Sequence, residues 1–167
     1  DIFFDEDGSY IISPNYNLNH KIIRQSNTFK NNVNPLNNHG FEINTSSSNI
    51  YGWQKEVTNN STAKIQNSIL LYGSKVLELY KSSTGTAKAY QDINVISGKD
   101  YIVTGYIKNE NTVGNGAFIS VTPVSGTFSN ISSSTKVKDC KDFIYFEYQF
   151  KANYNGRARI NLINESN

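Results

Sequence analysis

The side chains with the clearest chemical potential in this sequence are tyrosines that alternate with charged and amide residues. The segments KVLELYK, DYIVTGYIK and DFIYFEYQFK each place a tyrosine two positions from a charged residue. Residues two apart in a β-strand share one face. A flat ring beside such groups suits a sugar, whose apolar C–H face stacks on the ring while its hydroxyls need planar polar partners. The candidate ligand-binding residues are Trp53, Tyr80, Tyr90, Tyr106, Tyr145, Glu147, Gln149 and Arg159.

The sequence gives much weaker evidence for a catalytic site. The only histidines are His20 and His39, and neither has a partner at metal-ligand spacing such as H-x-x-x-H. The sequence contains no G-x-S-x-G nucleophile elbow, and its Gly114-Asn115-Gly116 segment is predicted to be a turn. A glycosidase would need two carboxylates facing one cleft. We therefore expect a non-catalytic protein.

Alternating polarity predicts strands along most of the chain and no helix. Turns containing Gly, Asn or Ser separate these strands, and many short strands at this spacing indicate an all-β sandwich or barrel. The predicted strands are 75–81, 86–95, 100–108, 116–122, 142–151 and 156–164. The residues assigned to the core are Leu77, Leu79, Tyr101, Val103, Gly105, Ile107, Phe146, Tyr148 and Phe150, with the intervening residues facing outward.

Composition narrows the class of protein further. The chain has 167 residues, enough for one compact domain, a net charge of +2 and a single cysteine, Cys140. Its basic residues are scattered, so nucleic acid is not an expected partner. The longest apolar run, Ile69–Tyr72, is far shorter than a membrane span. With no Met and no signal peptide, the chain is interpreted as part of a larger protein.

The first 33 residues differ from the rest. The segment Ile2–Ser13 predicts a short hairpin around Asp-Glu-Asp-Gly. The following Asn-rich stretch is weakly patterned and reads as a linker or an irregular arm. We expect residues 1–33 to form this arm and residues 34–167 to form the main domain.

Four motifs in the main domain resemble carbohydrate-binding modules of families 4, 9 and 22. They are NNHGFE at 37–42, YGW at 51–53, GSKVLEL at 73–79, and QDINV with GKDYIVTGYIK at 91–108. Their order and spacing extend over about 130 residues. The resemblance implies a jelly-roll β-sandwich of two antiparallel sheets. It further implies a non-catalytic module that binds a polysaccharide or glycan within a larger secreted or cell-surface protein.

The resemblance also implies a structural calcium ion. Glu42 of the G-F-E motif would be one ligand, and Asp5 another if the first strand replaces the closing aromatic-Asp strand of these modules. Nothing after Arg159–Asn164 supplies that closing strand, whereas Ile2-Phe3-Phe4-Asp5 has its character. A sheet without it would keep an open edge, which favours a strand-exchanged dimer. Alternatively, residues 2–12 are a plain hairpin that precedes the module and resembles the Y-D-x-x-G-x-L unit of YD-repeat surface and toxin proteins.

Two functional hypotheses therefore remain open. A surface with two or more exposed aromatic rings beside polar side chains would favour glycan binding. A flat face of Thr, Ser and Lys would favour a structural or receptor-binding domain of an adhesin or toxin. Trp53 has the alternative of closing one end of the core, and exposed tyrosines also occur simply because tyrosine favours strands.

Overall fold

The computed structural model describes residues 2–4, 10–12, 34–110, 113–125 and 136–166, and divides the chain into two compact units, Asp1–Asn34 and Pro35–Asn167. In the first unit, β1 (Ile2–Phe4) pairs antiparallel with β2 (Tyr10–Ile12), with Ile2 opposite Ile12. Asp5 lies outside the described residues. The proposed replacement of a closing strand by residues 2–12 stays a prediction.

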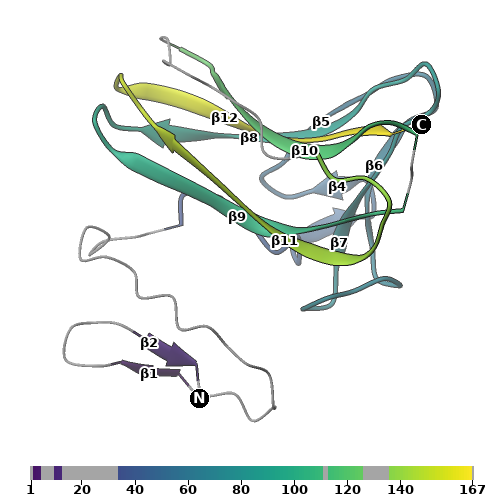
Figure 1. The fold of residues 1–167 in the computed structure, drawn as a ribbon, viewed down its shortest axis with the longest axis horizontal. Coiled ribbons are helices and arrows are strands. Elements are labelled where there is room, and N and C mark those ends of the chain that lie inside the picture. Colours follow the sequence, from purple (N-terminus) through teal and green to yellow (C-terminus); the bar gives the residue numbers. More distant parts are fainter. Residues whose placement is uncertain (1, 5–9, 13–33, 111–112, 126–135, 167) are drawn as a thin grey trace. The chain divides into compact units, whose positions relative to one another are not determined.

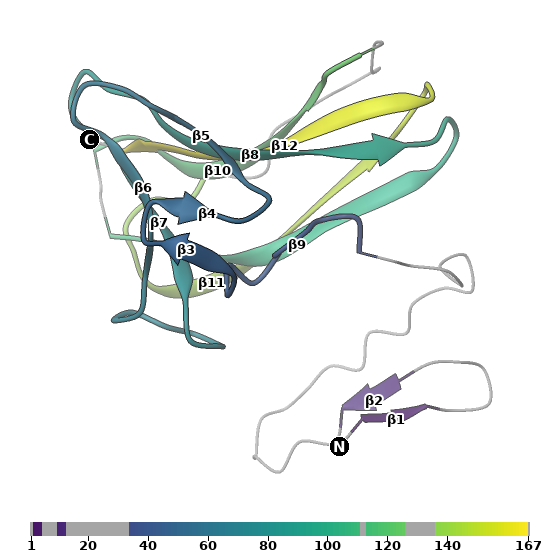
Figure 2. The ribbon, with the colours of Figure 1, turned by 180° about the vertical axis from the view of Figure 1, so that it is seen from behind.

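The second unit is a sandwich of antiparallel strands, which confirms the predicted all-β fold (Figure 1). One layer is a continuous sheet, in the order β10 (Gly114–Pro123), β12 (Gly156–Ser166), β8 (Ala87–Val95) and β5 (Gln54–Val57). The facing strands form two separate pairs, β11 (Cys140–Lys151) with β9 (Asp100–Asn109), and β6 (Thr62–Gln66) with β7 (Val76–Tyr80). Beside them lies the small hairpin of β3 (Asn44–Ser46) and β4 (Asn49–Ile50), seen in Figure 2.

The chain changes layer at every connection from β8 to β12 (Figures 1 and 2). As a result β12, which follows β10 and β11 in the sequence, lies between β8 and β10. This alternation is the pattern of a jelly roll. Among the described residues, no helix is long and apolar enough to cross a bilayer.

The sandwich is filled by two clusters of apolar side chains. The larger contains Val103, Tyr148, Phe150 and Ile160, and the smaller contains Trp53. Leu36 and Leu162 pack against both clusters and so join them. The inward assignments made for β9 and β11 are confirmed, because these strands bury alternate residues.

Local departures from the predicted pattern have local causes. Gly114–Gly116 is the start of β10 rather than a turn, and the register with β12 shifts between Gly114 and Ala117. Gly116 has a φ of +86°, and a Cβ there would collide with the carbonyl of Val137. Strict alternation from Phe146, Tyr148 and Phe150 would place Phe143 on the outer face, but Phe143 is half-buried, because the β11 register shifts between Cys140 and Ile144. Such bulges exchange the faces of a strand.

The central position of β12 yields a first prediction. Ile160 is 1% exposed within the larger cluster. Ile160→Ala should lower the free energy of unfolding by about 2–5 kcal/mol, because it removes buried methylenes and leaves a cavity. Ile96→Ala, at an exposed position, serves as the control and should change it by less than about 0.5 kcal/mol. Equal losses in urea denaturation would contradict the assignment of Ile160 to the core.

Candidate ligand-binding site

The motifs that are distant in the sequence meet around one buried amide. Gln91 projects from β8 toward the core and is 6% exposed. Its side-chain oxygen accepts a hydrogen bond from the Asn37 backbone N–H (2.7 Å), and its Nε2 donates to the carbonyl oxygens of Asn37 (3.0 Å) and Gly52 (2.8 Å). Because a buried amide must keep such partners, Gln91 fixes both segments to the sheet.

Trp53 lies in the core and not on the binding surface, which corrects its expected role as a ligand-stacking residue. It is 6% exposed, its Nε1 donates to the Asn38 carbonyl (3.2 Å), and its ring contacts Phe41 at 5.3 Å between centroids. A buried indole with a satisfied N–H and an aromatic neighbour is a packing residue. The alternative that Trp53 closes one end of the core fits this position.

Glu42 holds the loop between β6 and β7. Its carboxylate accepts hydrogen bonds from the Ser74 backbone N–H (2.8 Å), the Ser74 hydroxyl and the Lys75 backbone N–H (3.2 Å). The hydrogen bonds from Ser74 lower the pKa of Glu42, so the carboxylate stays ionised. Gly73 permits this approach, because its φ is +71° and a Cβ there would overlap the carboxylate.

These surroundings do not suit a calcium ion at Glu42. Ca²⁺ needs about six to eight oxygen ligands, whereas the carboxylate faces N–H and O–H donors. The Lys75 ammonium donates to the Glu42 backbone carbonyl and to the Asn44 Oδ1, both at 2.7 Å, so a cationic group of the chain already binds these oxygens. No group of three or more His, Cys, Asp or Glu side chains that could hold a metal occurs among the described residues. Calcium at Glu42 remains a prediction that this geometry does not favour.

Three tyrosines form a continuous row of rings on the outer surface. Tyr106 of β9 and Tyr145 of β11 are direct cross-strand neighbours, with ring centroids 5.5 Å apart. Tyr72, from the loop that Glu42 holds, contacts Tyr106 at 5.8 Å. Both contacts are edge-to-face, and the three residues are 69%, 47% and 48% exposed for Tyr72, Tyr106 and Tyr145. We call these three residues the tyrosine platform.

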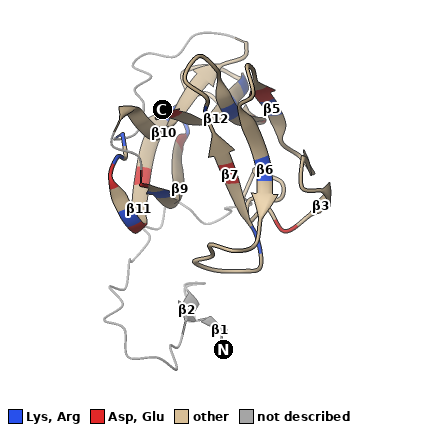
Figure 3. Ribbon diagram, turned by 90° about the vertical axis from the view of Figure 1, so that its right-hand side faces the viewer, with Lys and Arg blue, Asp and Glu red and all other residues tan. Residues whose placement is uncertain are grey.

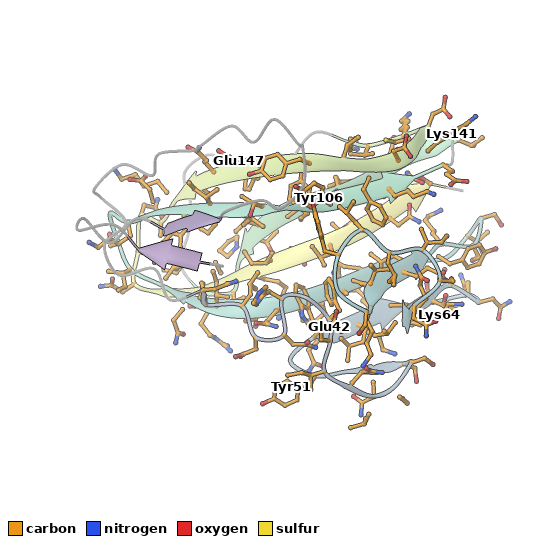
Figure 4. The ribbon with its side chains drawn as sticks, turned by 90° about the horizontal axis from the view of Figure 1, so that it is seen from below. Glu42, Tyr51, Lys64, Tyr106, Lys141 and Glu147 are labelled. Atoms are coloured by element: carbon orange, nitrogen blue, oxygen red, sulfur yellow. The ribbon has the colours of Figure 1, made fainter. Side chains whose placement is uncertain are left out.

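Polar side chains continue the platform along β11. Glu147 accepts hydrogen bonds from the Tyr145 hydroxyl (3.2 Å) and from Gln149 Nε2 (2.7 Å). Partial burial and then the Glu147 charge raise the pKa of Tyr145. Partial burial and then the neighbouring Tyr72 raise the pKa of Tyr106. Both phenols therefore keep their protons and can donate hydrogen bonds at neutral pH. Figure 4 shows Tyr106 and Glu147 on the same side of the β9–β11 pair.

The structure separates the other predicted ligand residues from this platform. Tyr90 and Arg159 lie on the outer face of the opposite layer, where the guanidinium stacks over the ring at 4.0 Å. That guanidinium also forms two hydrogen bonds with Asp92, of 2.7 and 3.1 Å, which lower the pKa of Asp92. Arg159 is thus occupied within the protein. Tyr80 is exposed on β7, and no ring contact in the described part of the chain joins it to the platform.

The surface around the platform is open. Two shallow depressions, of about 430 and 500 Å³, lie away from the three rings, and only the second reaches the platform's polar edge, at Gln149. Acidic and basic positions are scattered over the strands seen in Figure 3 and form no stripe of one sign in that view. This geometry suits a ligand that lies across a surface rather than one enclosed in a pocket.

Sequence reasoning missed Tyr72. The run Ile69–Tyr72 has strand length, but all four of its residues are exposed in the loop between β6 and β7. The available signal was that these apolar residues do not alternate with polar ones and directly precede a Gly-Ser turn.

Comparison with known proteins supports the fold. The structure is similar to the enzymatically active domain of tailspike protein 4 from bacteriophage CBA120, with a TM-score of 0.58 and 16% sequence identity. The alignment covers 74% of this chain but only 18% of that one, so this chain corresponds to less than a fifth of its structural neighbour. No protein-family model and no curated protein matches the sequence. At this identity the likeness establishes a shared β-rich fold.

The Glu42 contact can be tested through Gly73. Gly73→Ala should destabilise the protein by more than Gly98→Ala. Both positions have positive φ, at a cost of about 1–2 kcal/mol for alanine, but only position 73 meets the carboxylate, and nothing lies within 4 Å at position 98. Hydrogen exchange at the Ser74 and Lys75 amides should accelerate in the first variant alone. Unchanged exchange would show that Glu42 does not hold the loop.

Metal dependence is a separate test. Chelator and added calcium should both leave the melting temperature unchanged, because the Lys75 ammonium already binds the Glu42 backbone carbonyl and the Asn44 Oδ1. The Glu42 carboxylate is also engaged, since it accepts hydrogen bonds from Ser74 and from the Lys75 backbone N–H. A cation that binds the folded protein and is present at 100 times its dissociation constant would raise the free energy of unfolding by about 2.7 kcal/mol. A fall of several degrees in chelator, measured by calorimetry, would contradict this reading and support the calcium site.

Proposed function

We propose that this domain is a non-catalytic carbohydrate-binding module, and that the tyrosine platform with Glu147 and Gln149 is its binding surface. The observation that carries the proposal is the row of three exposed rings next to a carboxylate and an amide. Sugar rings bring apolar C–H faces for stacking and hydroxyls for planar polar partners, and this surface supplies both.

The arrangement of the rings supports this reading over one of strand propensity alone. The edge-to-face contacts fix Tyr106 between Tyr72 and Tyr145, so little side-chain entropy is lost when a ligand binds. One of the rings comes from a loop rather than a strand, and a separate hydrogen-bonded group, Glu42, holds that loop in place. The β-propensity of tyrosine alone explains neither the contacts between the three rings nor the tyrosine in a loop that Glu42 holds.

We further propose that the module belongs to the family 4, 9 and 22 type and to a larger secreted or cell-surface protein. The meeting of the four motifs around Gln91 and Glu42 supports the first part. A domain with such an open platform would direct a larger protein to a polysaccharide or glycan with modest affinity.

A protein-interaction role in an adhesin or toxin is the second candidate. The exposed apolar residues Ile69, Leu70 and Leu71 favour it, since consecutive apolar side chains at a loop often mark a contact surface. They adjoin Tyr72, so the same loop could serve either partner. Binding measurements distinguish these roles.

The proposal predicts that Tyr106→Ala weakens polysaccharide binding at least tenfold, equivalent to about 1.4 kcal/mol. Tyr106→Phe should retain most of the affinity, because it keeps the stacking ring. Tyr51→Ala is the matched control, since Tyr51 is also exposed but is well separated from Tyr106 in Figure 4. Affinity gels and glycan arrays, with circular dichroism for folding, provide the readouts. Absence of binding to any glycan by the folded protein would favour the protein-interaction role.

A further inference from the structure

Glu147 differs from the other glutamates that the structure describes. Four of them form ion pairs with lysines, at 2.5 to 3.6 Å: Glu56, Glu78, Glu110 and Glu165. Glu42 receives backbone N–H donors from its loop. Within the described residues, Glu147 has neither an ion-pair partner nor a backbone donor.

The neutral partners of Glu147 orient it without cancelling its charge. Tyr145 donates to Oε2 and Gln149 to Oε1, so both oxygens are held on the surface that carries the rings. Each carboxylate oxygen has further lone pairs. Pairs of neighbouring sugar hydroxyls can donate to them, and a hydrogen bond to a charged group is worth about 1.5–3 kcal/mol.

The nearby lysines do not supply a compensating charge. Lys108, two residues from Tyr106, is paired with Glu110 at 2.7 Å. Lys151, on the same face of β11 as Glu147, lies four residues away at the end of the strand and forms no ion pair with Glu147 among the described residues; its backbone neighbour on β9 is the acidic Asp100. The net charge at the centre of the surface is therefore the single negative charge of Glu147.

We infer that Glu147 makes this surface selective for uncharged glycans and rejects those that carry carboxylate or sulfate groups. The inference rests on the proposed function and assigns a ligand class to the same site. An acidic sugar stacked on the platform would bring its anion close to Glu147 in a partly desolvated setting, where like charges repel strongly.

The test compares polymers that share a backbone and differ in charge. Dextran is paired with carboxymethyl dextran, and hydroxyethyl cellulose with carboxymethyl cellulose. For at least one pair, the wild-type protein should bind the neutral member at least tenfold more tightly at low salt. Glu147→Gln should weaken binding of the neutral member by up to about tenfold, because hydrogen bonds to an uncharged amide are weaker than those to a carboxylate. It should nevertheless bring the ratio of the two affinities close to one, because the repulsion of the charged member is removed.

Two controls make the result specific. Glu56→Gln changes the net charge equally, but on the opposite layer, and should preserve the discrimination. Raising the salt concentration should narrow the wild-type ratio and leave the Glu147→Gln ratio unchanged, because salt screens exposed charges.

The possible failures are distinguishable. Equal wild-type affinity for both members of every bound pair overturns the inference and leaves the proposed function intact. Discrimination that survives in Glu147→Gln, or is lost equally in Glu56→Gln, also overturns it. No binding to any neutral polymer overturns the proposed function, and the inference with it.

Discussion

The arrangement of the candidate site depends on the buried side-chain amide of Gln91. Its hydrogen bonds to Asn37 and Gly52 tie the irregular segment before β5 to the centre of the four-stranded sheet. This positions Trp53, which packs in the smaller core cluster and donates to the Asn38 carbonyl. It also places Glu42 where it can reach the loop before β7. Leaving such an amide unpaired would cost about 1–3 kcal/mol. The hydrogen bonds of Gln91 therefore favour the arrangement in which both segments are in place and the site is formed.

The binding surface combines elements of different rigidity. Tyr106 and Tyr145 sit on paired strands whose opposite faces are packed into the core, whereas Tyr72 sits on a loop. Gly73 allows that loop to approach Glu42, and Gln66 adds a second constraint by bonding Ser68 and Ile69. The loop is thus ordered by polar contacts rather than by burial. Polar ordering lets its apolar side chains stay exposed to a ligand.

The sequence predicted the long strands well, because one face of each is buried and the alternation is regular. It missed β5, whose four residues are all exposed, and β6, whose only strong signals are Ala63 and Ile65. The outward faces were also predicted correctly for Tyr106, Tyr145, Glu147 and Gln149. The sequence could not predict which of these side chains lie next to one another in space. The register that sets Tyr145 opposite Tyr106 joins strands about 40 residues apart, and parity alone does not say which layer carries each tyrosine. Tyr90 and Arg159 therefore joined the same candidate set, although they lie on the other side of the sandwich.

The place of β12 between β8 and β10 bears on how the protein is made. Those two strands have no pairing with each other and come together only through β12, which leaves the ribosome after both. Until then, their backbone donors and apolar faces are open to other chains, a condition that promotes aggregation. The layers also close through contacts between distant residues, and such topologies fold in about milliseconds to seconds. The strand order therefore leaves the four-stranded sheet incomplete until β12 has been synthesised.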